Sequence, residues 1–143
     1  MSVQHTIAAS PAQVWRVLAD GWLYTGWVVG ASHIRAVDDG WPGVGTSIHH
    51  AVGGWPLLIR DRTEVLESVP AQRLVLRARA WPMGEARVEL DLQAEGTGCT
   101  VTMTEHPTRG PGRWVHTPLQ QRVLEARNRE GLARLAAVVE GRE

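Results

Sequence analysis

Apolar and polar residues alternate with a period of two over much of the chain, which is typical of strands that bury one face. The first run places Val3, His5 and Ile7 on one side, and further runs separated by turn residues follow between positions 32 and 105. None of these runs is joined to the next by the long helical segment that a parallel crossover needs. We therefore expect an antiparallel sheet, with later strands at His33–Val37, Thr46–Val52, Leu57–Leu66, Leu74–Ala80, Ala86–Leu92 and Cys99–Glu105.

Two short helical segments are predicted after the first strand. Ser10–Gln13 offers an N-cap serine, a proline at the first helical position and a glutamine three residues later, which together form a capping box. Val14, Trp15 and Leu18 then share one helical face. Asp20–Gly30 contains too many glycines for a long helix and predicts a short helical turn between loops.

The end of the chain predicts one long amphipathic helix. Pro107–Pro111 is expected to end the last strand, and Thr117–Gln120 repeats the capping-box pattern. A helix over Pro118–Glu140 would span about 34 Å. At about 100° per residue, one stripe of this helix faces the sheet, and it consists of Leu124, Asn128, Gly131, Leu135 and Val138.

Composition narrows the classes of function. With 143 residues, 43% of them hydrophobic and 21% charged, the chain fits one globular domain over residues 1–143. The formal net charge is zero, so no overall field favours nucleic acid or an anionic membrane. Lysine does not occur in the sequence, which excludes Schiff-base chemistry and a P-loop lysine. The single cysteine, Cys99, cannot form an internal disulfide, and no apolar run is long enough to cross a bilayer, so a cytoplasmic protein is expected.

Metal, nucleotide and nucleic-acid sites are not expected. Adjacent residues of a strand point to opposite faces, so His49 and His50 cannot bind the same ion. Gly43–Gly45 is a turn, because the third glycine and the helix of a dinucleotide fingerprint do not follow. The arginines of the last helix alternate with glutamates, which is typical of a solvated face.

Five short motifs in order resemble the START/SRPBCC superfamily, and within it the bacterial polyketide cyclase/dehydrase-like branch. They are Ile7–Trp15, Gly43–Thr46, Glu64–Val65 with Val69–Pro70, Gly98–Val101 and Asn128–Glu130. The resemblance implies an α+β helix-grip fold. In this fold a curved seven-stranded antiparallel sheet wraps around a long C-terminal helix, and two short helices follow the first strand.

The resemblance also implies a cavity between the sheet and the long helix. Its expected occupant is a hydrophobic small molecule, such as a polyketide, an aromatic metabolite or a lipid, and its expected chemistry is cyclisation or dehydration without a cofactor. A non-catalytic carrier or sensor is an alternative that would use the same cavity. A protein-interaction module like the chaperone activators of this fold is another. The sequence leaves a monomer and a homodimer open.

Strand alternation supplies the candidate catalytic residues. If Val101 and Met103 face inward, so does Glu105, and His50 and His5 follow Ile48 and Ile7 in the same way. A buried carboxylate and imidazole could transfer protons beside a substrate carbonyl, so Glu105 and His50 are the catalytic candidates. Alternatively, Glu105 is a strand-end carboxylate paired with one of the many arginines, for instance Arg77 or Arg109. A slip of one residue would turn either histidine to solvent.

The candidate ligand-binding residues are mainly aromatic. The sequence has seven tryptophans, one tyrosine and no phenylalanine, and indole faces hold flat apolar ligands well. Gly131 could instead allow close packing of the helix on the sheet, and Asn128 could be a buried amide bonded to a strand carbonyl. The predicted ligand-binding set is His5, Trp22, Tyr24, Trp27, Trp55, Asn128 and Gly131.

Overall fold

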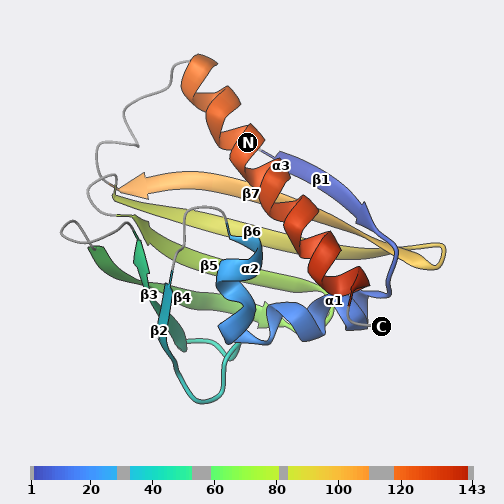
Figure 1. Ribbon diagram of the computed structural model, residues 1–143, viewed down its shortest axis with the longest axis horizontal. Helices are drawn as coiled ribbons and strands as arrows, with labels where there is room; N and C mark the ends of the chain where they lie inside the picture. The colour runs from blue at the N-terminus through green and yellow to red at the C-terminus, as the bar shows by residue number, and fades with distance from the viewer. Residues whose placement is uncertain (1, 29–32, 53–58, 81–83, 110–117, 142–143) are drawn as a thin grey trace.

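The computed structural model describes residues 2–28, 33–52, 59–80, 84–109 and 118–141 (Figure 1). In this part of the chain the strands form one antiparallel sheet in the order β1-β7-β6-β5-β4-β3-β2. This confirms the predicted antiparallel, seven-stranded sheet. Its strands are β1 (Ser2–Ile7), β2 (His33–Val37), β3 (Ser47–Val52), β4 (Ile59–Val69), β5 (Arg73–Ala80), β6 (Gly84–Glu95) and β7 (Gly98–Arg109).

Short helices follow β1, as the capping pattern predicts. Helix α1 (Pro11–Leu18) begins with the complete capping box, because Ser10 Oγ accepts from Gln13 N–H and the Gln13 side chain accepts from Ser10 N–H. The 3₁₀ helix η1 (Gly21–Leu23) and helix α2 (Tyr24–Trp27) come next. Helix α3 (Pro118–Glu140) ends the fold with the predicted bounds.

Helix α3 runs diagonally across one face of the sheet, and α1, η1 and α2 lie beside it on the same face (Figure 1). We call this covered side the inner face. Here the C-terminal half of α3 packs on the sheet and on α1, because Leu132 and Leu135 are fully buried together with Ile7 and Val14. The buried stripe is Asn128, Gly131, Leu132, Leu135, Ala136 and Val139. It is turned slightly from the predicted stripe, since Leu124 and Val138 are only half-buried.

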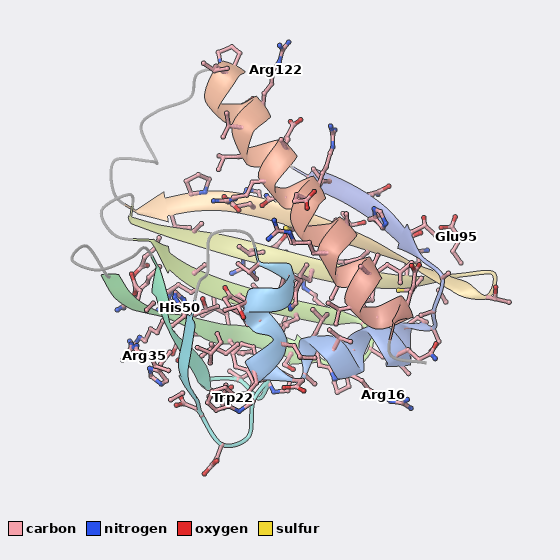
Figure 2. The ribbon with its side chains drawn as sticks, viewed as in Figure 1. Arg16, Trp22, Arg35, His50, Glu95 and Arg122 are labelled. Carbon is pink, nitrogen blue, oxygen red and sulfur yellow. The ribbon has the colours of Figure 1, made fainter. Side chains whose placement is uncertain are left out.

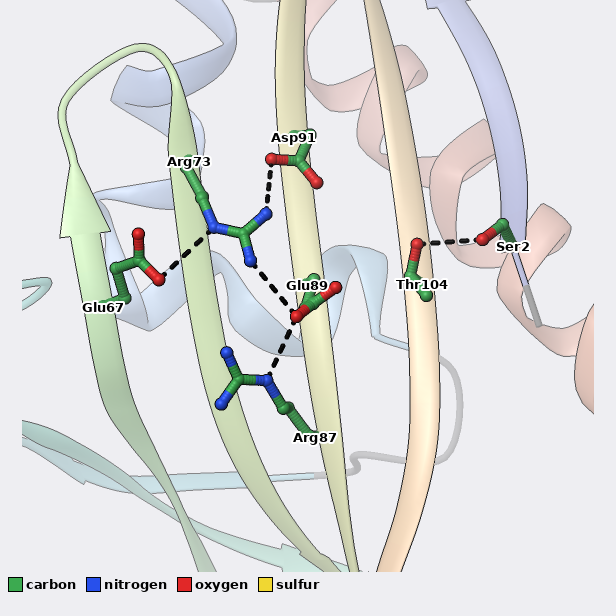
Figure 3. Close-up of polar contacts among 7 residues, drawn as sticks. All are labelled: Ser2, Glu67, Arg73, Arg87, Glu89, Asp91 and Thr104. Atoms are coloured by element: carbon green, nitrogen blue, oxygen red, sulfur yellow. Dashed lines mark hydrogen bonds and ion pairs between the residues drawn. The ribbon is translucent and has the colours of Figure 1, made fainter.

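The outer face of the sheet carries ion pairs. Arg73 on β5 contacts Glu67 on β4 at 3.3 Å, and Glu89 and Asp91 on β6 at 3.1 and 2.7 Å (Figure 3). Arg87, also on β6, contacts the same Glu89 at 3.1 Å. Much of the positive charge of the outer face is therefore balanced by carboxylates on neighbouring strands.

The last strand is longer than predicted. Pro107 was expected to end it, yet β7 continues to Arg109, with Pro107 opposite Ala86 of β6. The described pairing of β7 with β1 stops at Ser2 and Thr104, so the last residues of β7 lie at an edge of the sheet. A proline is tolerated at an edge because its missing N–H breaks no central ladder.

Candidate functional site

A chain of hydrogen bonds links α2 to two neighbouring strands on the inner face. Tyr24 on α2 places its hydroxyl 2.9 Å from Thr63 Oγ1 on β4, and His50 Nε2 on β3 lies 3.0 Å from the same oxygen. The Tyr24 ring also stacks on the His50 ring, with centroids 5.8 Å apart and an interplanar angle of 18°. All three side chains are buried. The predicted inward direction of His50 is therefore confirmed (Figure 2).

The other ring nitrogen of His50 has no partner. His50 Nδ1 is buried and accepts or donates no hydrogen bond among the described residues. A buried polar atom without a partner costs about 1–3 kcal/mol relative to a satisfied one. The site therefore offers a polar atom that a ligand or a water molecule could satisfy.

Burial lowers the pKa of His50 below its usual value of 6.5, although nearby Asp61 acts in the opposite direction. The folded state thus favours the neutral imidazole. As the pH falls below about 6.5, the His50 ring therefore binds protons more readily in the unfolded chain than in the folded protein. The free energy of unfolding that depends on a neutral His50 is therefore fully present above that pH and is lost as the pH falls.

We expect His50→Gln to flatten the loss of unfolding free energy between about pH 7 and pH 5. The wild-type slope due to this residue is at most about 1.4 kcal/mol per pH unit. Urea unfolding at a series of pH values measures the slope, and His49→Gln is the control because His49 lies half-buried on the opposite face of β3. Equal slopes in the wild type and in the His50 variant would contradict the expectation.

A second polar group joins β7 to α3. Arg127 Nη2 donates to both Glu105 oxygens, at 2.6 and 2.9 Å, and Asn128 Nδ2 donates to Glu105 Oε1 at 3.3 Å. Glu105 is 8% exposed and Asn128 6% exposed. The alternative that Glu105 pairs with an arginine is therefore confirmed, and that arginine is Arg127, whereas Arg77 pairs with Glu64. In the part of the chain that the structure describes, the Asn128 amide bonds to this carboxylate and not to a strand carbonyl.

The two groups act electrostatically on each other. Burial raises the pKa of the Tyr24 phenol; the Thr63 hydrogen bond and the Arg127 charge lower this pKa, and the Glu105 charge raises it. Tyr24 is therefore within electrostatic range of the ion pair. We call the six side chains the inner polar cluster, and its members are Tyr24, His50, Thr63, Glu105, Arg127 and Asn128.

Small, half-buried residues border the inner polar cluster. Thr63 pairs with Ala78, which pairs with Ala86, and Val88 pairs with Glu105, so all three neighbours share the inner face. Ala78, Ala86 and Val88 are half-buried, whereas Leu76 and Leu90 on the same strands are fully covered. The inner face is thus sealed at the end of the sheet beneath α1 and less completely covered at the end that holds Glu105.

Two predicted ligand-binding residues, Trp27 and Gly131, lie where α2 and α3 meet. A Cβ atom on Gly131 would lie 3.0 Å from the Trp27 carbonyl oxygen, so the glycine lets α3 approach α2 closely. Trp27 is 4% exposed and meets Tyr24 edge to face, with ring centroids 5.5 Å apart. Trp27 therefore holds Tyr24 in place against His50.

Three other predicted residues lie outside the inner polar cluster. His5 faces inward and pairs with Val101, two inner-face positions along β7 from Glu105, so the register separates it from the inner polar cluster. Trp22 is 59% exposed and lies near the lower edge of the molecule in Figure 2. Trp55 lies outside the described residues.

Sequence reasoning missed Thr63 and Arg127. Arg127 lies about 20° from Val138 in the helical projection, at the border of the predicted stripe, so the same arithmetic could have found it. Thr63 carried no such signal, because threonine is common on either face of a strand. Its role depends on Tyr24 and His50, which are distant in sequence.

The described residues contain no group of three or more His, Cys, Asp or Glu side chains arranged to hold a metal ion. Of the helices in the same ranges, none is long and apolar enough to cross a membrane.

Comparisons with known proteins identify the family. Residues 1–140 match the family described as "Polyketide cyclase / dehydrase and lipid transport", and no curated protein matches significantly in sequence. A solved structure from Nitrosomonas europaea has a TM-score of 0.75 at 17% identity, covering 100% of this chain and 95% of its own. One from Mesorhizobium loti has a TM-score of 0.73 at 18% identity, covering 100% and 98%. The di-domain ARO/CYC protein StfQ of the steffimycin biosynthetic pathway has a TM-score of 0.74 at 11% identity, covering 99% of this chain and 50% of StfQ. The chain therefore belongs to the polyketide cyclase/dehydrase and lipid transport family, in agreement with the resemblance of its sequence to the START/SRPBCC superfamily.

Proposed function

We propose that this chain binds a hydrophobic small molecule, of the aromatic or polyketide type, between the inner face of the sheet and the N-terminal half of α3. The observation that carries the proposal is the buried, unpartnered Nδ1 of His50. It belongs to a cluster that borders half-buried small side chains at Ala78 and Ala86. A site with apolar walls and a few convergent polar groups is the usual form of a small-molecule site.

The comparisons support this class of ligand. The matched family is described by polyketide cyclisation, dehydration and lipid transport, which all concern apolar or amphipathic molecules. StfQ is named as an ARO/CYC protein of a biosynthetic pathway. These descriptions favour an apolar ligand for this chain, and the inner polar cluster supplies the groups that would orient it.

For catalysis, we assign the proton-transfer role to His50 rather than to Glu105. The His50 ring is held neutral by burial and its Nδ1 is unpartnered among the described residues, so it can exchange a proton with a bound molecule. The Glu105 oxygens already accept hydrogen bonds from Arg127 and Asn128. In this assignment Tyr24 and Thr63 orient the imidazole, and Glu105 holds Arg127 in place.

Binding is tested with the neutral naphthalene dye prodan, whose emission moves to shorter wavelength in apolar surroundings. We expect saturable binding to the wild type and at least about tenfold weaker binding to Ala78→Leu. The larger side chain would occupy space beside Thr63, and overpacking costs about 1–3 kcal/mol.

The control is Ala36→Leu, because Ala36 is an exposed residue of β2. It should bind the dye as the wild type does, and circular dichroism should show that both variants are folded. Equal affinity of the wild type and Ala78→Leu would contradict the proposed site. Measuring turnover of the bound ligand then distinguishes an enzyme from a carrier. An enzyme would convert its ligand, and the His50→Gln variant would lose this conversion. A carrier or sensor would release the ligand unchanged.

A further inference from the structure

The contact between Glu105 and Arg127 uses only part of the guanidinium. Arg127 Nη2 alone donates to the two carboxylate oxygens, in an end-on arrangement. A guanidinium has five N–H donors. Among the residues that the structure describes, Nη1 and Nε of Arg127 therefore keep three N–H groups without a protein acceptor.

The side chain that carries these free donors is partly exposed. The Arg127 side chain is 40% exposed, while that of its partner Glu105 is 8% exposed. The carboxylate is fixed from two sides, by Arg127 and Asn128. The guanidinium is therefore anchored at one nitrogen, on a side chain that stays partly exposed.

The inner polar cluster carries no net charge near neutral pH. The positive charge of Arg127 is balanced by Glu105 at 2.6 Å. Burial lowers the pKa of His50 and raises the pKa of Tyr24, so both rings are neutral. A ligand carboxylate placed on Arg127 would thus add an uncompensated negative charge beside Glu105, and unpaired charge in a partly desolvated site is costly.

A carbonyl oxygen avoids this cost, because it accepts the same N–H groups without adding charge. We propose that the site selects neutral ligands that present a ketone, ester or amide oxygen to Arg127, and that it discriminates against the same molecule bearing a free carboxylate. This inference rests on the proposed function, because it concerns the polar end of the hydrophobic ligand proposed above.

Three naphthalenes substituted at the same ring position test the inference: acetylnaphthalene, isopropylnaphthalene and naphthoate. They share size and shape and differ in the group offered to Arg127. Their affinities are measured at pH 7.5 by displacement of prodan. We expect the ketone to bind about tenfold more tightly than the isopropyl compound and at least about tenfold more tightly than the carboxylate.

The variant Glu105→Gln should reverse the preference for the ketone over the carboxylate. It keeps the size of the side chain and removes the negative charge, so Arg127 becomes an uncompensated cation that favours an anion. We expect naphthoate to gain at least about tenfold in affinity relative to the ketone. Glu64→Gln is the matched control: Glu64 pairs with Arg77 at 3.2 Å on the outer face, and its loss should leave the order unchanged.

The outcomes separate the two proposals. If prodan itself does not bind the wild type, both the hydrophobic site and the inference are overturned. If prodan binds but none of the three compounds displaces it, the hydrophobic site stands and the inference is overturned. If the isopropyl compound binds as tightly as the ketone, hydrophobic binding stands and the inference is overturned. If naphthoate matches the ketone in the wild type, or if a folded Glu105→Gln variant keeps the wild-type order, the inference is also overturned. If Glu105→Gln does not fold, the order of the three affinities in the wild type decides whether the inference stands.

Discussion

Replacing Leu132 by alanine is expected to lower the free energy of unfolding by about 3 kcal/mol. Leu132 is fully buried on α3, in the core that also contains Ile7 and Val14. The substitution removes buried methyl groups and leaves a void that the surrounding strands and helix can fill only in part. Urea unfolding followed by tryptophan fluorescence measures the loss.

The matched control is Val123→Ala on the same helix. Val123 is 61% exposed, so its truncation should change the free energy of unfolding by no more than about 0.5 kcal/mol. Comparable losses in both variants would mean that α3 packs along its whole length. The structure instead concentrates the packing in the C-terminal half of the helix and leaves the first half for the proposed site.

Replacing Arg127 by alanine should cost about 2 kcal/mol of unfolding free energy. Among the described residues, the variant leaves the buried Glu105 with the Asn128 amide as its one remaining donor. Removing one partner of a fully buried ion pair costs about 3–5 kcal/mol, and partial exposure of Arg127 reduces this figure. Chemical unfolding at pH 7 gives the value.

A double-mutant cycle shows the origin of that loss. In Glu105→Gln/Arg127→Ala no carboxylate is left buried, so the double variant should be more stable than Arg127→Ala alone. Arg77→Ala is the outer-face comparison. Its partner Glu64 is partly exposed, and the loss should stay below about 1 kcal/mol. If the double variant is less stable than Arg127→Ala, the ion pair is not what stabilises this contact.

Local signals predicted the elements well. The capping box at Ser10–Gln13 located α1, and the bounds of α3 followed from the proline at its start and the apolar stripe. Both signals depend on residues a few positions apart, so they can be read without knowing the fold. The prediction that Pro107 ends the last strand was wrong for the opposite reason, because whether a proline ends a strand depends on whether that strand lies at an edge of the sheet.

The candidate site was predicted only in part. Alternation along one strand indicated that His50 and Glu105 face inward, and both are buried as expected. The same reasoning brought His5 to the site, but the period of two says only which face a residue takes. Its position along that face depends on strand pairing, which puts His5 beside Val101, two inner-face positions along β7 from Glu105.

The sequence by itself determined the helices, the antiparallel strands and the face on which most inner residues lie, because these features depend on repeats of two or about 3.6 residues. Only the tertiary structure decided which side chains contact one another. Fifteen arginines could have met Glu105. The diagonal path of α3 across the sheet selected Arg127, and the contact of α2 with β3 and β4 brought Tyr24 to Thr63 and His50. Such contacts join residues far apart in sequence, and local periodicity carries no information about which distant residues will meet.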